Sequence, residues 1–146
     1  MTGTAAAGPE ADAQEAAERM VRDLCEAVDA HDFDRFGAYF TDTAYYRFGN
    51  AEPLRGRAAI AAATAGAVAA IPPVRHRVDQ VVRHGDQLFC RFTIEVAAPA
   101  GPVVMPCVTV VELAPGRQAG EDAVIVDYRV HMDIAPALEA AEAARV

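Results

Sequence analysis

The stretch AVIVDYRVHMD, residues 123–133, decides the fold because its side chains divide into an apolar and a largely polar set. Successive side chains of an extended strand point to opposite faces, so the pattern predicts a β-strand. One face holds Val124, Val126, Tyr128, Val130 and Met132, and the other holds Ile125, Asp127, Arg129, His131 and Asp133. The polar face has two interpretations: it is a solvent-facing ladder of ion pairs, or its end, with His131 and Asp133, faces a pocket.

Three further strand-like runs precede this stretch, over residues 74–83, 87–97 and 103–113. The segments between them contain Gly, Pro and Asp, which are typical of turns. Strands joined by hairpin connections pair antiparallel, so we expect four adjacent antiparallel strands. A short aromatic strand is expected earlier in the chain, over residues 44–48.

The first half of the chain repeats its apolar residues at helical spacing. We expect a helix from Asp12, a short second helix capped by Asp32, and a third over residues 60–71 that Pro72 and Pro73 end. Three helices cannot cover both faces of the sheet, so one face curls around them and the other meets solvent or a second subunit. We expect a disordered leader over residues 1–11, one domain over 12–138 and a C-terminal tail over 139–146.

Composition excludes several classes of function. The 146 residues contain neither Ser nor Lys, which excludes Ser-His-Asp hydrolysis, Schiff-base chemistry and a P-loop lysine. The net charge of -8 and the absence of a basic block argue against a nucleic-acid partner. No run reaches the roughly 20 apolar residues of a membrane span, and no signal peptide is recognisable, so we expect a cytoplasmic protein without a membrane partner.

Cysteine and histidine positions give no sign of a metal. Cys25, Cys90 and Cys107 are widely spaced, and no histidine pair has the spacing of metal ligands. We therefore interpret the cysteines as reduced core thiols and expect neither a metal nor another cofactor.

Two other residues carry candidate chemistry. Arg91 shares a strand face with Phe89, Thr93 and Glu95, where it either orients a carboxylate through paired hydrogen bonds or lies on the surface. The second is one of the adjacent tyrosines Tyr45 and Tyr46, which face opposite sides of the first strand: it either packs in the core or offers its hydroxyl to a substrate oxygen in a cavity.

The order of elements and three motifs resemble the SnoaL-like branch of the nuclear transport factor two-like superfamily. The motifs are Phe40-Thr41-Asp42, Pro53-Leu54-Arg55-Gly56-Arg57 and Tyr128-Arg129-Val130-His131-Met132-Asp133, and the resemblance spans about residues 14–138. That branch includes polyketide cyclases, limonene-epoxide hydrolase and ketosteroid isomerase. The resemblance implies an α+β cone, in which a strongly curved antiparallel sheet wraps three N-terminal helices, encloses an apolar pocket and forms a homodimer through its outer face.

Residue matching to these relatives separates three chemistries. The isomerase's base falls on Phe48 and its two oxyanion donors on Leu24 and Val108, which are apolar, so steroid-type isomerisation is not expected. The epoxide hydrolase pattern keeps its Tyr, Arg and final Asp as Tyr46, Arg91 and Asp133. Phe48 and Thr93 replace its other two polar residues, for which Asn50 or Glu95 would have to compensate.

The cyclase pattern needs only a carboxylate near the end of the last strand, which Asp133 matches. The resemblance therefore implies an acid–base enzyme for an apolar polyketide- or terpenoid-like molecule, acting by cyclisation or epoxide opening. Asp133 would be the acid or base, with Arg91 orienting it and Tyr46 and His131 as donors. The substrate-binding set implied is Leu24, Phe48, Asn50, Thr93, Glu95 and Val108. The alternatives are a non-catalytic binding or assembly protein of the same fold, and a pocket that only folds a reactive substrate.

Overall fold

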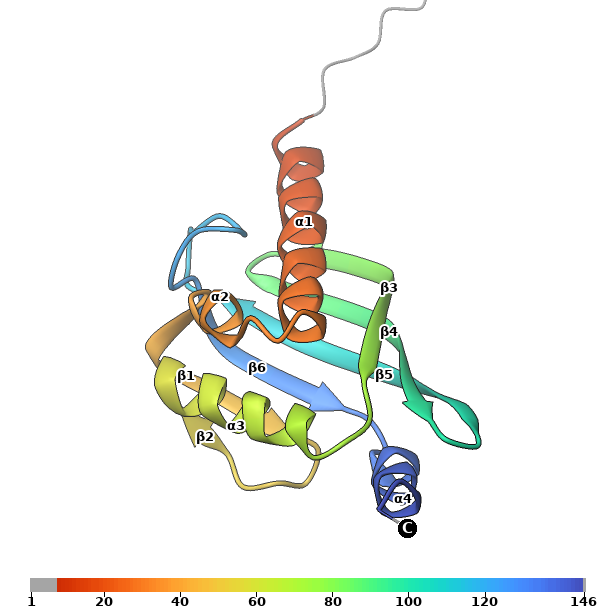
Figure 1. Cartoon of the computed structure of the whole chain (residues 1–146). Helices are drawn as coiled ribbons and strands as arrows, with labels where there is room; N and C mark the ends of the chain where they lie inside the picture. The colour runs from red at the N-terminus through yellow and green to blue at the C-terminus, as the bar shows by residue number, and fades with distance from the viewer. Residues whose placement is uncertain (1–7, 146) are drawn as a thin grey trace, which may run out of the picture.

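The structure, a computed structural model, describes residues 8–145. Four helices and six strands follow one another along the chain (Figure 1). In order they are α1 (Pro9–Asp29), α2 (Phe33–Gly37), β1 (Phe40–Phe48), β2 (Leu54–Arg55), α3 (Arg57–Ala69), β3 (Val74–His84), β4 (Gln87–Ala98), β5 (Gly101–Leu113), β6 (Ile125–His131) and α4 (Ala135–Ala143).

The ends of the chain differ from expectation. Helix α1 begins at Pro9 rather than Asp12, since proline is well suited to the first turn of a helix. Residues 1–7 of the expected leader lie outside the described residues. The expected tail is in part helical, because α4 reaches Ala143 and buries Ala140 and Ala141. Among residues 8–145, no helix is long and apolar enough to cross a membrane.

The six strands form one sheet in the order β2-β1-β6-β5-β4-β3. The expected meander of β3, β4, β5 and β6 is antiparallel throughout. Strand β1 is longer than expected and pairs with β6 in parallel, which corrects the prediction of a purely antiparallel sheet. The reason is topological: β1 and β6 are far apart in the chain, so no hairpin turn fixes their relative direction.

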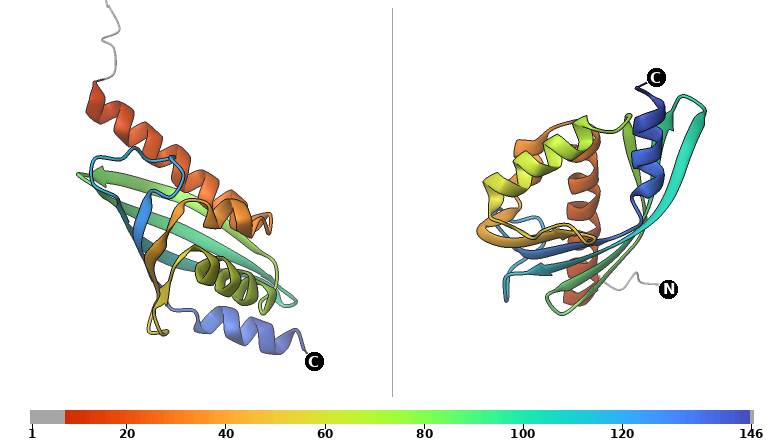
Figure 2. Two further views of the ribbon diagram at one scale, coloured as in Figure 1. Left: turned by 90° about the vertical axis from the view of Figure 1, so that its left-hand side faces the viewer. Right: turned by 90° about the horizontal axis from the view of Figure 1, so that it is seen from below.

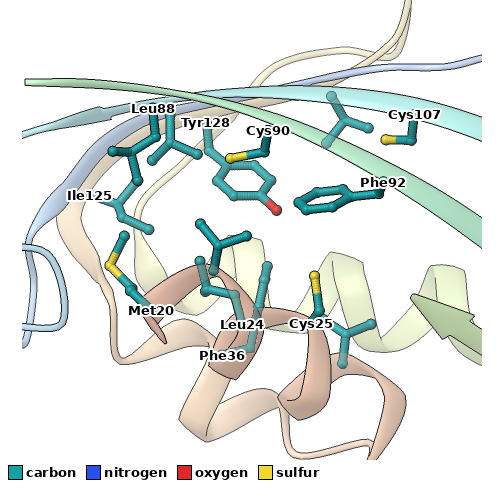
Figure 3. Packing of buried hydrophobic residues seen from close by; sticks show 14 of the residues in the cluster. Met20, Leu24, Cys25, Phe36, Leu88, Cys90, Phe92, Cys107, Ile125 and Tyr128 are labelled. Atoms are coloured by element: carbon teal, nitrogen blue, oxygen red, sulfur yellow. The ribbon is translucent and has the colours of Figure 1, made fainter. Parts of the chain in front are cut away.

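The sheet is strongly curved and open, with α1, α2 and α3 on its concave side (Figure 2). This confirms the expected α+β cone. Alternate residues of β4 show which face is inside: Cys90, Phe92 and Ile94 are buried, whereas Phe89 and Arg91 are exposed. Side chains from α1 pack against this inner face (Figure 3). Burial of the apolar face is the arrangement that removes the most apolar area from water.

Helix α1 is fastened to β3, which is an edge strand of the sheet. Near its start, the Gln14 amide donates to the Val81 carbonyl at 2.5 Å and accepts from the Arg83 backbone N–H at 2.8 Å. At its last residue, Asp29 accepts from the backbone N–H of His76 at 2.8 Å. These bonds satisfy backbone groups that an edge strand otherwise leaves unpaired. They also fix the position of His76 against the helix.

Gly56 sets the start of α3. Its φ is +91°, and a Cβ there would lie 2.6 Å from the Asp42 carbonyl oxygen, so only glycine fits. The Gly56 carbonyl accepts from the N–H of Ile60, which is fully buried. The turn therefore directs α3 across the open side of the curved sheet.

Candidate functional site

A cavity of about 490 Å³ lies between the concave face of the sheet and the helices. Its lining is almost entirely apolar, with contributions from all four helices and all six strands. Examples are Leu24, Phe36, Phe48, Phe92, Val96 and Met105. The size and apolar character are those of a small-molecule pocket. A second hollow of about 540 Å³, between Ala69–Pro73 and the end of α4, is a shallow surface groove with Arg145 as its one titratable residue.

His76 and Asp29 form an acid–base pair on the wall of this pocket. The His76 ring lines the cavity, and its Nδ1 lies 2.6 Å from Asp29 Oδ1. The other carboxylate oxygen accepts from the His76 backbone N–H, so Asp29 holds the residue at two points. We assign the ring proton to Nδ1, because the carboxylate is an acceptor. Nε2 then carries the lone pair, and no residue among 8–145 forms a hydrogen bond with it.

Tyr46 on β1 and Tyr128 on β6 contribute phenols to the same cavity. Burial raises the pKa of Tyr46 to about 12, against a smaller lowering by the Thr64 hydroxyl. Burial likewise raises the pKa of Tyr128 well above its usual value. Both phenols therefore stay protonated at neutral pH and act as hydrogen-bond donors rather than as bases.

Two thiols and two hydroxyls also belong to the lining, those of Cys25, Cys107, Thr64 and Thr109. Cys25 and Cys107 line the cavity, and the Cys107 Sγ lies 3.7 Å from the Thr109 hydroxyl. Burial raises the pKa of both thiols, so they are neutral rather than nucleophilic thiolates. All three cysteines are free, which confirms the interpretation of reduced core thiols. Within the described part of the chain, no three metal-ligating side chains gather in one place.

Three of the residues singled out from the sequence line the pocket: Leu24, Tyr46 and Phe48. Tyr46 is buried, as a pocket hydroxyl requires. Leu24 and Phe48 present only carbon to the cavity. The structure thus brings together one donor and two apolar contacts from the predicted set.

The other predicted residues lie outside the pocket. Arg91, Glu95, Val108 and His131 are exposed on the convex face, and Asn50 is exposed in the β1–β2 loop. Thr93 is also on the convex face, where its hydroxyl donates to Asp79 at 2.6 Å and accepts from Arg77 at 3.0 Å. The prediction that these residues contact the ligand was wrong. Each strand turns its apolar side chains inward, and on β4, β5 and β6 the predicted residues lie on the other, outward-facing side of the strand.

Asp133 is also exposed, so the expectation that its carboxylate faces the pocket was wrong. Its Oδ1 accepts from the backbone N–H of Ala135 at 3.0 Å, at the first residue of α4. A carboxylate in this position stabilises the start of a helix. The geometry therefore gives Asp133 a structural contact, and Asp133 is not among the residues that line the pocket.

The His76–Asp29 pair was missed, although the sequence holds a signal for His76. In VRHRV, residues 74–78, arginines alternate with Val74, His76 and Val78, so the histidine shares a face with two valines. Its contact with Asp29 spans 47 residues and leaves no local pattern. Glu52, in the β1–β2 loop, is the remaining ionisable residue of the lining, and it is exposed at the mouth.

Comparisons with known proteins agree with this architecture. A family model described as a SnoaL-like domain matches residues 21–121. The comparison with curated proteins finds no match. Among solved structures, a protein of Jannaschia sp. CCS1 assigned as a SnoaL-like polyketide cyclase has a TM-score of 0.71 and 20% identity over 97% of this chain and 99% of its own.

Two further structures are similar at the level of the fold. An epoxide hydrolase of Mycobacterium tuberculosis, of the limonene-epoxide-hydrolase-like type, has a TM-score of 0.66 and 17% identity over 88% of this chain and 91% of its own. SalBIII, an epoxide hydrolase/cyclase-like enzyme in pyran ring formation in the polyether salinomycin, has a TM-score of 0.66 and 20% identity over 83% and 93%. At these identities the likeness shows a shared fold.

Proposed function

The chain belongs to the family of SnoaL-like domains, and on that premise we propose that it is a small-molecule enzyme that performs acid–base chemistry on an apolar polyketide- or terpenoid-like substrate inside the pocket. The observation that carries the proposal is the His76–Asp29 pair on the wall of an apolar cavity, with two protonated phenols in the same lining. Acid–base chemistry needs a base and a donor and is favoured by apolar surroundings, and the lining of this cavity supports all three.

His76 is the proposed base. Asp29 accepts the Nδ1 proton, which leaves the lone pair on Nε2 for a substrate proton. When Nε2 takes that proton, the carboxylate 2.6 Å from Nδ1 stabilises the imidazolium that forms. Asp29 is a positioning residue in this scheme, since it acts on the substrate through His76.

The phenols of Tyr46 and Tyr128 are the proposed donors to substrate oxygen. They belong to β1 and β6, which are inner strands of the sheet, whereas His76 belongs to the edge strand β3. The sheet is strongly curved (Figure 2), and residues of β1, β3 and β6 line one cavity. A ligand that fills the cavity therefore has the base and the donors on different walls.

Ring closure is the reaction that this arrangement favours. His76 Nε2 removes a proton from a carbon beside a carbonyl, and the electron pair moves onto the carbonyl oxygen, which accepts a hydrogen bond from a phenol. The enolate carbon then attacks a second carbonyl of the same molecule, and the imidazolium returns the proton to the new alkoxide. Epoxide opening is less favoured, because the Arg91, Thr93 and Asp133 positions of the hydrolase pattern lie outside the pocket.

Proton abstraction is testable with 2-tetralone, an apolar bicyclic ketone, in D2O. The native protein should accelerate deuterium incorporation beside the carbonyl, as followed by NMR. His76→Gln should lower the protein-dependent rate by about 100-fold or more, the usual contribution of a general base. Asp133→Asn is the matched control and should keep the native rate, since Asp133 is exposed and bonds only to α4.

Two results would reject the enzyme proposal. Equal exchange by the native protein and His76→Gln would show that His76 is not the base. Binding of 2-tetralone, seen as chemical-shift changes, with exchange no faster than in buffer would favour the non-catalytic binding or assembly protein instead.

A further inference from the structure

We infer that the ligand of this pocket carries no anionic group. The inference deepens the proposed function, because it names the substrate class of the same site and rests on that site being the one that binds. It comes from the charges of the lining. The sequence contains thirteen arginines and no lysine, yet among residues 8–145, where all thirteen lie, no arginine lines the pocket. The lining holds one imidazole, that of His76, and one carboxylate, that of Glu52.

Three arginines illustrate how the positive side chains are turned away from the pocket or engaged elsewhere. Arg75 and Arg77 flank His76 on β3 but are exposed on the convex face, where Arg77 bonds to Asp79 at 2.8 Å. Arg57, at the start of α3, donates to the carbonyl oxygens of Phe40 and Ala38 at 3.0 and 3.2 Å. The same alternation that makes the concave face apolar therefore also removes cations from it.

An anion inside this cavity would lose its hydration without gaining a positive partner. A buried charge is tolerated only where it is paired and hydrogen-bonded. The side-chain donors of the lining include the two phenols and the Cys25 and Cys107 thiols, which are neutral, whereas the Thr64 hydroxyl already donates to the Ile60 carbonyl at 2.8 Å. The Asp29 carboxylate behind His76 and the Glu52 carboxylate at the mouth would both repel a negative ligand.

The proposed chemistry also favours a ligand without an anionic group. In a neutral substrate, proton transfer creates one negative charge on the ligand oxygen and one positive charge on His76, so the net charge of the pocket does not change. A substrate with a free carboxylate would add a second negative charge with no further cation in the lining. The substrate class is therefore a ketone, ester, lactone or phenol without a free carboxylate, sulfate or phosphate.

Matched probes test the inference without any need for turnover. Methyl 2-naphthoate and 2-naphthoic acid share one ring system, and at pH 7.5 the second is an anion. The chain contains no Trp, so naphthalene fluorescence reports their binding cleanly. We expect the ester to bind at least about 100-fold more tightly than the acid, because the acid pays for the loss of its hydration. Affinities within threefold of each other would overturn the inference.

A cation placed at the pocket separates the charge effect from simple hydrophobicity. Leu138 on α4 lines the cavity and is 52% exposed, so Leu138→Arg puts a guanidinium at the rim without burying it. The ratio of the ester's affinity to the acid's affinity should be about tenfold smaller in this variant than in the native protein. Ala143→Arg is the control, since Ala143 is exposed on the same helix and does not line the cavity. Equal ratios in the two variants would also overturn the inference.

The outcomes distinguish the two proposals. A clear preference for the ester together with no exchange of 2-tetralone would leave the neutral-ligand inference standing and reject the enzyme. Active exchange with equal binding of ester and acid would reject the inference alone. If neither methyl 2-naphthoate nor 2-naphthoic acid bound, both the neutral-ligand inference and the enzyme proposal would be rejected.

Discussion

The rings of Tyr46 and Tyr128 lie parallel in the structure, with centroids 5.4 Å apart and planes 7° apart. The two residues are register partners in the parallel β1–β6 pair, so their side chains leave the sheet on the same face. Phe36 and Phe40 contact the Tyr128 ring at steeper angles. The stack therefore fixes both rings, and the Tyr128 hydroxyl points toward the space beside Phe92 (Figure 3).

Removing the Tyr128 hydroxyl should separate its chemistry from its packing. Tyr128→Phe keeps the stack, so the free energy of unfolding in urea should fall by only about 1 kcal/mol. Exchange of 2-tetralone should slow by about 100-fold, the usual effect of losing a donor to a developing oxyanion. Tyr128→Ala is the packing control and should cost about 3–5 kcal/mol, because it leaves a large cavity. Native exchange rates in both Tyr128→Phe and Tyr46→Phe would contradict the role of the phenols.

Asp29→Asn should change the protonation of His76 rather than its place. The amide oxygen still accepts from the His76 backbone N–H, but the amide NH2 now donates to Nδ1 and moves the ring proton to Nε2. Nitrogen-15 spectra of the imidazole should show this change of tautomer, and exchange of 2-tetralone should fall by about 100-fold or more.

The control for this variant is Asp79→Asn, because Asp79 lies on β3, the strand that holds His76. Asp79 bonds to Arg77 and Thr93 on the convex face and should leave the His76 spectrum as in the native protein. An unchanged tautomer in Asp29→Asn would show that the carboxylate does not set the protonation of His76.

Alkaline pH should weaken the fold. Burial raises the pKa of Tyr46 from 10.0 to about 12 and the pKa of Cys90 from 9.0 to about 12. The unfolded chain therefore loses these protons at lower pH than the folded chain does. Stability from these groups is complete below about pH 9 and is lost as pH rises from there to about 12.

Urea unfolding at a series of pH values checks this window. The free energy of unfolding should be level between pH 7.5 and 8.5 and should then decline. Tyr46→Phe should show a shallower decline above pH 10, because it has no phenol to ionise at that position. A level profile up to pH 11 would contradict the prediction.

The convex face of the sheet is the expected dimer interface, as the resemblance implied. Val104 and Val108 project outward from β5 and are 60% and 44% exposed, and Phe89 on the neighbouring strand is 42% exposed. A row of exposed apolar side chains of this kind is typical of an interaction surface. Light scattering should give the mass of a dimer, and Val108→Arg should give the mass of a monomer. Leu138→Arg, on α4, should remain dimeric. A native protein with the mass of a monomer would contradict the expected dimer.

Much of the fold was predictable because its signals are local. The alternation in residues 87–97 and 103–113, with the turn residues between them, predicted β4 and β5, and the structure pairs these strands antiparallel. The Asp32 cap of α2 was predicted in the same way and forms, with Oδ1 accepting from the Arg35 N–H at 3.1 Å. The parallel β1–β6 pair had no such signal, because its strands are joined through most of the chain.

The site was only partly predictable, and the reason is the two-residue period of a strand. The sequence by itself determined which residues share a face, so Phe92 was separated from Arg91, and Met132 from Asp133. Only the tertiary structure decided which face turns toward the helices. Burial of the apolar face lowers the free energy, whereas burial of Arg91 and its neighbours would leave charges without water. The same folding brings Asp29 at the end of α1 to His76 on β3, a contact that no short-range pattern contains.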